Sequence, residues 1–166
     1  MSFLLGFRYP TLKQQKKTIM ATQPTQRSII MHFREPPSDS DLQSLAEELM
    51  DSVPDELADF CADLRIVVED FPSSELEAEM ELEDSFDLLA LYRSGSEKIP
   101  GVESKLAANT PTLLLFRRPI LDVWCETHDD LTGLIRHIMV TEIATANGFS
   151  AAEGEALALR HQQGLF

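Results

Sequence analysis

The chain has 166 residues, of which 43% are hydrophobic and 25% charged, and its formal net charge is −14. This length and composition predict one globular domain with a real core, and no apolar run approaches the roughly 18 residues that a membrane-spanning helix needs. An acidic body repels phosphate backbones, so we expect neither nucleic acid nor membrane as a partner of the body.

Residues 1–37 look like a flexible N-terminal extension, because neither helical nor strand periodicity is sustained there. Residues 1–36 hold six basic residues against Glu35 alone, a net charge of +5, so the rest of the chain carries −19. Such an arm is typical of a solvated tail, although a basic arm could also contact nucleic acid or an anionic surface. Met20 and Met31 are alternative starts. We place the folded domain at residues 38–166.

The two cysteines, Cys61 and Cys125, cannot form a disulfide framework. They are also too few for a structural zinc site without histidines at suitable spacing. Two small apolar thiols fit a reducing compartment, and the opening FLLGF is too short for a secretory signal. These features predict a cytoplasmic protein.

The first part of the domain is predicted to contain two helices and a strand. Ser40 followed by Gln43 reads as a capping box. Apolar residues then recur at helical spacing: Leu42, Leu45, Ala46, Leu49 and Met50. The pattern ends before Val53, and Pro54 suits the first position of a second helix. Residues 65–69, RIVVE, are rich in β-branched side chains and predict a strand.

Residues 75–84 form the most acidic run, in which Glu alternates with Leu, Ala and Met. The alternation suggests a strand, whereas the residue types favour a helix, and both readings stay open. Carboxylates could bind calcium, but the run lacks a Gly-bearing calcium loop. We therefore interpret it as a solvated face.

Two further strands are predicted after this run. Residues 86–92 indicate a strand or an extended segment, and residues 93–109 a loop. Residues 112–116, TLLLF, predict a strong strand. Because proline interrupts strands, Pro119 should end it, and we expect residues 120–124 to form an edge strand or a short turn.

The longest predicted helix begins at Leu131, after a capping-box-like pair of Thr127 and Asp130. With Leu131 at zero and about 100° per residue, an apolar stripe contains Leu134, Ile135 and Ile138. Glu142 falls at about 20°, in the middle of that stripe.

A carboxylate on a core-facing stripe is costly unless it has a partner. Glu142 should therefore reach solvent or a buried backbone donor, or it should point into a pocket as an acid or base would. Gly148 is the natural end of the helix. Ser150 and Glu153 form another capping box, which predicts a last helix from Ala151 to about residue 162.

Four segments together resemble the small bacterial zincin-like metallopeptidase family. They are RIVVEDFPSSE at 65–75, LLALYRSG at 88–95, TLLLFRRPIL at 112–121 and VTEIATANGFS at 140–150. The resemblance covers roughly residues 40–160. It implies an α+β fold: a single zincin-like domain with a small mixed sheet packed on a long central helix and flanking helices.

In that family the helix carries H-E-x-x-H-x-x-G, with a third ligand three residues after the Gly. The histidines bind zinc and the Glu activates a bound water. The resemblance implies that Glu142 keeps the general-base position, whereas Thr141, Thr145 and Ala151 occupy the ligand positions. Threonine is a poor zinc ligand and alanine has no ligand atom, so no bound zinc is expected and Glu142 would be vestigial.

Three functions follow. The first is a pseudo-metallopeptidase whose former cleft, with LLALYRSG as a wall, binds a peptide or protein partner. The second is an active metallopeptidase or hydrolase that has rebuilt its site around Glu142, with His137 or His161 as a ligand. The third is a structural protein in which Glu142 pairs with a buried arginine. The oligomeric state is not predicted.

Overall fold

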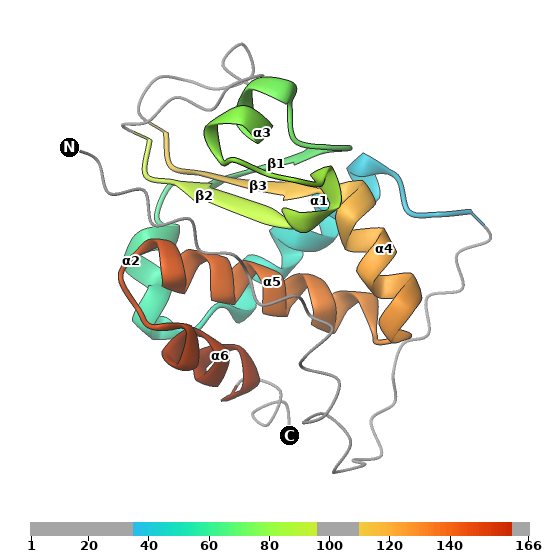
Figure 1. Cartoon of the computed structure of the whole chain (residues 1–166). Helices are drawn as coiled ribbons and strands as arrows, with labels where there is room; N and C mark the ends of the chain where they lie inside the picture. Colours follow the sequence, from blue (N-terminus) through green and yellow to red (C-terminus); the bar gives the residue numbers. More distant parts are fainter. Residues whose placement is uncertain (1–34, 96–109, 161–166) are drawn as a thin grey trace.

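A three-stranded sheet lies across one long helix in the computed structural model, which describes residues 35–95 and 110–160 (Figure 1). The strands are β1 (Arg65–Glu69), β2 (Ala90–Arg93) and β3 (Thr112–Phe116). Their order is β1-β3-β2, and β3 is parallel to β1 but antiparallel to β2. This small mixed sheet confirms the predicted α+β fold class. The edge strand β2 supplies the segment expected to border the cleft.

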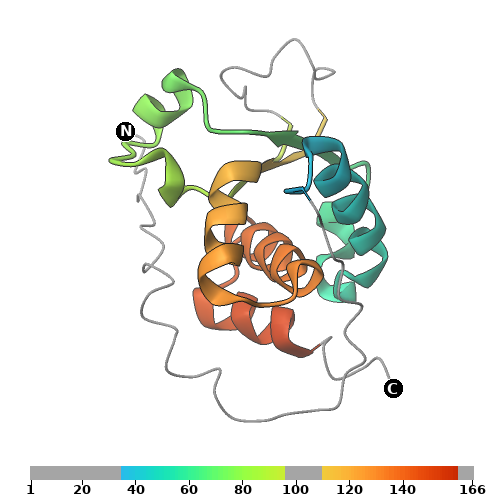
Figure 2. The same cartoon turned by 90° about the vertical axis from the view of Figure 1, so that its right-hand side faces the viewer.

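Two layers of helices cover the two faces of the sheet. The long helix α5 (Leu131–Ala146) and helix α1 (Asp39–Leu49) pack against one face, and the short helix α3 (Ser74–Glu79) lies over the other (Figures 1 and 2). Because side chains alternate along a strand, neighbouring residues enter different cores. Tyr92 and Leu113 belong to the α5 side, whereas Leu91 and Leu114 pack with α3.

Helix α5 is central, as seen nearly end-on in Figure 2. The sheet and α1 contact it on one side, and the last helix, α6 (Ala151–Arg160), packs along another. Ten of its 16 residues are buried. The apolar stripe inferred from the sequence was therefore too narrow, because two separate layers bury this helix.

Helix α4 (Arg117–Thr127) and four short elements complete the described chain: η2 (Met50–Ser52), η3 (Asp55–Leu57), α2 (Ala58–Cys61) and η4 (Ser85–Asp87). Within the described ranges, every helix is too short or too polar to span a membrane. The predicted extension 1–37 lies almost wholly outside the described residues, as do residues 96–109 of the predicted loop and His161.

The two clearest strand predictions are confirmed residue by residue, at 65–69 and 112–116. The acidic run is helical at its start, as α3, so residue propensity prevailed over the period-two pattern. Gly148 ends α5 with a φ of 91°, and the capping box of Ser150 and Glu153 begins α6. Gly tolerates this left-handed conformation because it has no Cβ.

The prediction for residues 117–124 was wrong, because they form helix α4 directly after β3. Pro119 is the third residue of this helix. The first four N–H groups of a helix have no intrahelical partner, so proline there costs no hydrogen bond. The buried side chains of Pro119, Ile120 and Leu121 then hold the helix against the core.

Two helix caps also differ from the predicted ones. Helix α1 is capped two residues earlier than expected: Ser38 Oγ accepts from Asp41 N, and the Asp41 carboxylate accepts from Ser38 N at 2.9 Å. Helix α5 is capped by Asp130 itself, whose carboxylate accepts from Gly133 N at 2.9 Å. Thr127 instead ends α4. In both cases the pattern indicated the helix but not the residue that caps it, and for α5 the predicted first residue, Leu131, is confirmed.

Candidate functional site

Glu142 lies on α5 where the helix passes beneath β2. The residue is only 7% exposed, and its Oε1 accepts a hydrogen bond of 2.9 Å from the backbone N–H of Tyr92. A buried carboxylate needs such a donor, because an unpaired polar group in a core costs about 1–3 kcal/mol and a charged one more. Of the alternatives read from the sequence, the backbone donor is therefore the one that the structure contains.

The register of the sheet explains why that N–H is available. Leu89 O accepts from Phe116 N at 2.9 Å, which defines a hydrogen-bonded pair between β2 and β3. Pairs alternate along an antiparallel ladder, so Leu91 and Arg93 also direct their peptide groups toward β3. Ala90 and Tyr92 direct theirs to the outer edge of β2. Glu142 thus binds the edge strand on its outer side.

The three positions that the family resemblance assigns to zinc ligands lie around the end of α5. Thr141 is half-buried, and its hydroxyl donates to His137 O at 2.8 Å and contacts Ile138 O at 3.1 Å. Thr145 is half-buried one turn further along. Ala151 is the exposed first residue of α6, just after the turn at Gly148.

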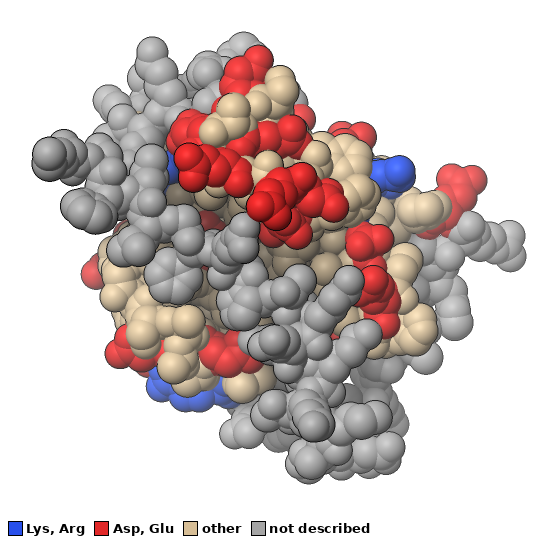
Figure 3. Space-filling view, viewed as in Figure 1, with Lys and Arg blue, Asp and Glu red and all other residues tan. Residues whose placement is uncertain are grey.

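The donor set does not fit zinc. Zinc in proteins is bound by thiolate, imidazole and carboxylate groups, whereas these positions present two hydroxyls and a methyl group. Among residues 35–95 and 110–160, no group of three His, Cys, Asp or Glu side chains could hold a metal ion. The carboxylates that gather over α3 on the face shown in Figure 3 provide no such group either, within the described residues.

His137 faces away from Glu142. Its Nε2 lies 3.2 Å from the Glu155 carboxylate on α6, so it serves the contact between the two last helices. Glu142 comes five positions after His137, which places the two side chains about 140° apart around the helix. His161, the other histidine considered for a rebuilt site, lies outside the described residues.

Arg136 is a buried charge on α5 that the sequence analysis missed. It is 8% exposed, and burial lowers the pKa of its guanidinium from the ordinary value. Nη1 donates to Ala158 O at 2.7 Å, Nη2 to Ser52 O at 3.0 Å and Nε to Ser52 Oγ at 3.2 Å. The sequence feature that could have indicated this buried charge is the position of Arg136 between the apolar residues Ile135 and Ile138.

The mixed sheet, the helix beneath its edge strand and the turn after Gly148 define a zincin-like domain. The chain belongs to the zincin-like metallopeptidase family, whose model matches residues 61–160. A search of curated proteins returns no match. The matched range includes the strands, α5 and α6, but not α1.

Proposed function

We propose that this chain is a pseudo-metallopeptidase, a zincin-like domain that has lost its zinc site. The observation that carries the proposal is the bond from Tyr92 N–H to Glu142, beside ligand positions that hold Thr141, Thr145 and Ala151. A zinc-bound water is acidic enough to be deprotonated near neutral pH, whereas bulk water is not. Without the metal, Glu142 has no such water to activate, and its carboxylate joins α5 to the sheet instead.

Metal analysis of protein purified without a His tag tests the loss of the site. After equilibration with excess zinc and exhaustive dialysis, we expect far less than one zinc per chain by mass spectrometry. The matched control is Glu142→Gln, which should give the same low value. Stoichiometric zinc in the parent chain that disappears in Glu142→Gln would contradict the proposal.

Restoring the ligands tests whether the scaffold is the inherited one. We expect the variant Thr141→His, Thr145→His, Ala151→Asp to bind one zinc per chain. Residues four apart share a helix face, and the turn at Gly148 returns the chain toward them. The control with only the two histidines should bind zinc more weakly, because it has one ligand fewer. A triple variant with native circular dichroism but no zinc binding would show that the geometry is not the family's.

The alternative is an enzyme rebuilt around Glu142 with His137 or His161. The contact between His137 Nε2 and the Glu155 carboxylate supports the pseudo-metallopeptidase over the His137 form of this alternative, because that imidazole is engaged by α6. Metal content should be unchanged in His137→Ala and in His161→Ala. A metal lost in either variant would instead favour the rebuilt site.

A peptide or protein partner in the former cleft is the binding role we propose for the domain. The half-buried Thr145 and the exposed Ala151 are small side chains at the positions of zinc ligands, so a partner can approach them closely. Strand addition to β2 is a costlier mode, because Glu142 already accepts from Tyr92 N–H and this residue is buried. We therefore expect a partner to contact the turn between α5 and α6.

Nuclear magnetic resonance tests this binding role with a defined probe, the unfolded peptides of a casein digest. Amide shifts should change at Thr145, Gly148 and Ala151. Residues of α4 on the other side of the domain serve as the internal control and should keep their shifts. No change at the turn, or equal changes throughout the domain, would contradict a site in the former cleft.

A further inference from the structure

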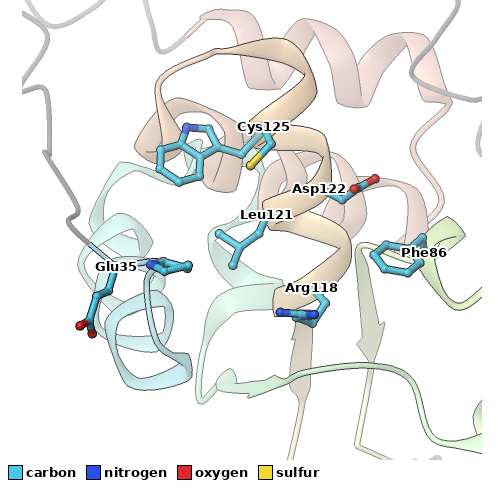
Figure 4. A pocket seen from close by; sticks show the side chains of 8 residues that line it. Glu35, Phe86, Arg118, Leu121, Asp122 and Cys125 are labelled. Carbon is cyan, nitrogen blue, oxygen red and sulfur yellow. The ribbon is translucent and has the colours of Figure 1, made fainter.

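A pocket of about 510 Å³ lies beside α4, and Glu142 is not among the described residues that line it (Figure 4). Residues from three separate stretches line it: Glu35, Pro36, Phe86, Arg118, Leu121, Asp122, Trp124 and Cys125. None of them belongs to the positions aligned with the zinc site. The pocket was not foreseen from the sequence, because residues 120–124 were read as a strand or turn.

The pocket and its surroundings present apolar surface to solvent. Phe86 is 42% exposed, and its ring packs edge-to-face on that of Phe71, which is 37% exposed, with centroids 5.1 Å apart. Leu121, half-buried Trp124 and Pro36 add further apolar area to the lining. An exposed apolar patch that is partly concave is typical of a surface that another segment or molecule covers.

The chain enters the described body at this pocket. Arg117 Nε donates to Pro37 O at 2.6 Å, and this bond fixes the entry point beside the start of α4. Glu35 and Pro36, which come directly before Pro37, line the pocket. The segment that precedes Glu35 in the sequence is therefore attached at the rim of the pocket. Five residues of extended chain span at most about 17 Å, so residues 29–33 are within reach of the pocket floor.

The chemistry of those residues matches the pocket. Residues 29–33 read Ile-Ile-Met-His-Phe, and four of the five are apolar. Residues 1–34 hold six basic side chains and no acidic one, whereas Glu35 and Asp122 lie at the pocket. A basic segment and an acidic body attract each other. Arg118 is the only cation among the described residues that line the pocket.

We propose that residues 29–33 dock in the pocket beside α4, so that Ile29, Ile30 and Phe33 cover Leu121, Trp124 and Phe86. The tether favours this occupant over a second copy of the chain. A covalently linked segment has an effective concentration in the millimolar range, which a dimer must match through affinity alone. Docking at this pocket is independent of whether the domain binds zinc.

The single tryptophan of the chain gives a direct readout, because Trp124 lines the pocket. Replacing the apolar residues of the segment, as Ile29→Ser, Ile30→Ser and Phe33→Ser together, should shift the Trp124 emission to longer wavelength. It should also raise the acrylamide quenching constant. The matched control removes three apolar residues further out, as Phe3→Ser, Leu4→Ser and Phe7→Ser, and should leave both unchanged. Equal spectra for the parent chain and both variants would overturn the proposal.

A cross-link tests proximity and separates the possible occupants. Cys125 is exposed at the pocket, whereas burial raises the pKa of the Cys61 thiol and makes it less reactive. With a short bismaleimide, His32→Cys should form an intramolecular link to Cys125, identified by peptide mapping. The control Thr11→Cys should form much less. Links between two chains, or none above the control, would overturn the intramolecular docking.

Discussion

Helix α5 carries two buried charges that are fixed in different ways. Arg136 makes three hydrogen bonds, to the end of η2 and to the last turn of α6, so one side chain ties three elements together. Glu142 accepts from the edge strand β2 through Tyr92 N–H. The two side chains lie about 120° apart around the helix and do not serve as each other's partner.

Under the function proposed above, Arg136 is a structural charge, whereas Glu142 is a charge that remains from a catalytic motif. Each nitrogen of the buried Arg136 guanidinium donates to a backbone carbonyl or a hydroxyl, so the side chain joins structural elements. Glu142 stands where the family resemblance implies a general base, and its carboxylate is bonded to the sheet through Tyr92 N–H. A buried charged residue on a central helix therefore does not identify a working site. Whether such a residue belongs to a working site depends on the chemical groups that surround its side chain.

Removing the arginine should have the largest effect. We expect Arg136→Met to lower the free energy of unfolding by about 3 kcal/mol, because the carbonyls of Ser52 and Ala158 lose a charged donor in the core. Urea denaturation measures it. The control Arg160→Met removes an exposed pair with Glu56 and should cost about 1 kcal/mol or less. Equal losses for both variants would remove the contrast between Arg136 and a surface charge.

The carboxylate should show an intermediate effect. Glu142→Ala leaves Tyr92 N–H without this acceptor and should cost about 2 kcal/mol, whereas Glu142→Gln keeps an acceptor oxygen and should cost less. Urea unfolding gives the energies, and hydrogen exchange at the Tyr92 amide reports the bond directly. Equal destabilisation by Glu142→Gln and Glu142→Ala, with a Tyr92 amide exchange rate equal to that of the parent chain, would show that the bond to β2 does not fix the carboxylate.

The smallest effect should come from the exposed carboxylates at helix starts. The backbone N–H and side chain of Ser150 hold the pKa of Glu153 below 4.5, and the side chain and backbone N–H of Ser38 hold that of Asp41 below 3.8. Folding therefore favours the ionised form. This stabilisation is fully present above the unfolded pKa values and is lost as pH falls through the lowered ones.

We expect Glu153→Gln to flatten the acid limb of the stability profile slightly, measured as the urea midpoint between about pH 5 and pH 2. The variant Glu155→Gln, on the same helix but paired with His137, is the matched comparison. An unchanged acid limb in Glu153→Gln would mean that the cap does not hold α6. The buried clamp of Arg136 on Ala158 would then be its main attachment.

Much of the local structure could be read from residue patterns. The strands at 65–69 and 112–116, the end of α5 at Gly148 and the capping box of α6 depend on short-range chemistry. The prediction for α4 failed because Pro119 was treated as a strand breaker without regard to its position near a helix start. The acidic run stayed undecided, since period and propensity disagreed and packing of Leu76 was needed to choose.

For the candidate site, the sequence by itself determined the residue types at the positions that the family resemblance assigns to catalysis and zinc binding. Two threonines and an alanine cannot supply imidazole or carboxylate ligands, whatever the fold. Only the tertiary structure decided what Glu142 contacts, because Tyr92 is 50 residues away in the chain and its free edge depends on the strand order. The same holds for Arg136, whose partners come from η2 and α6, and for the pocket beside α4. Patterns along a chain report neighbours in sequence, whereas these sites are made by segments that meet only when the layers pack.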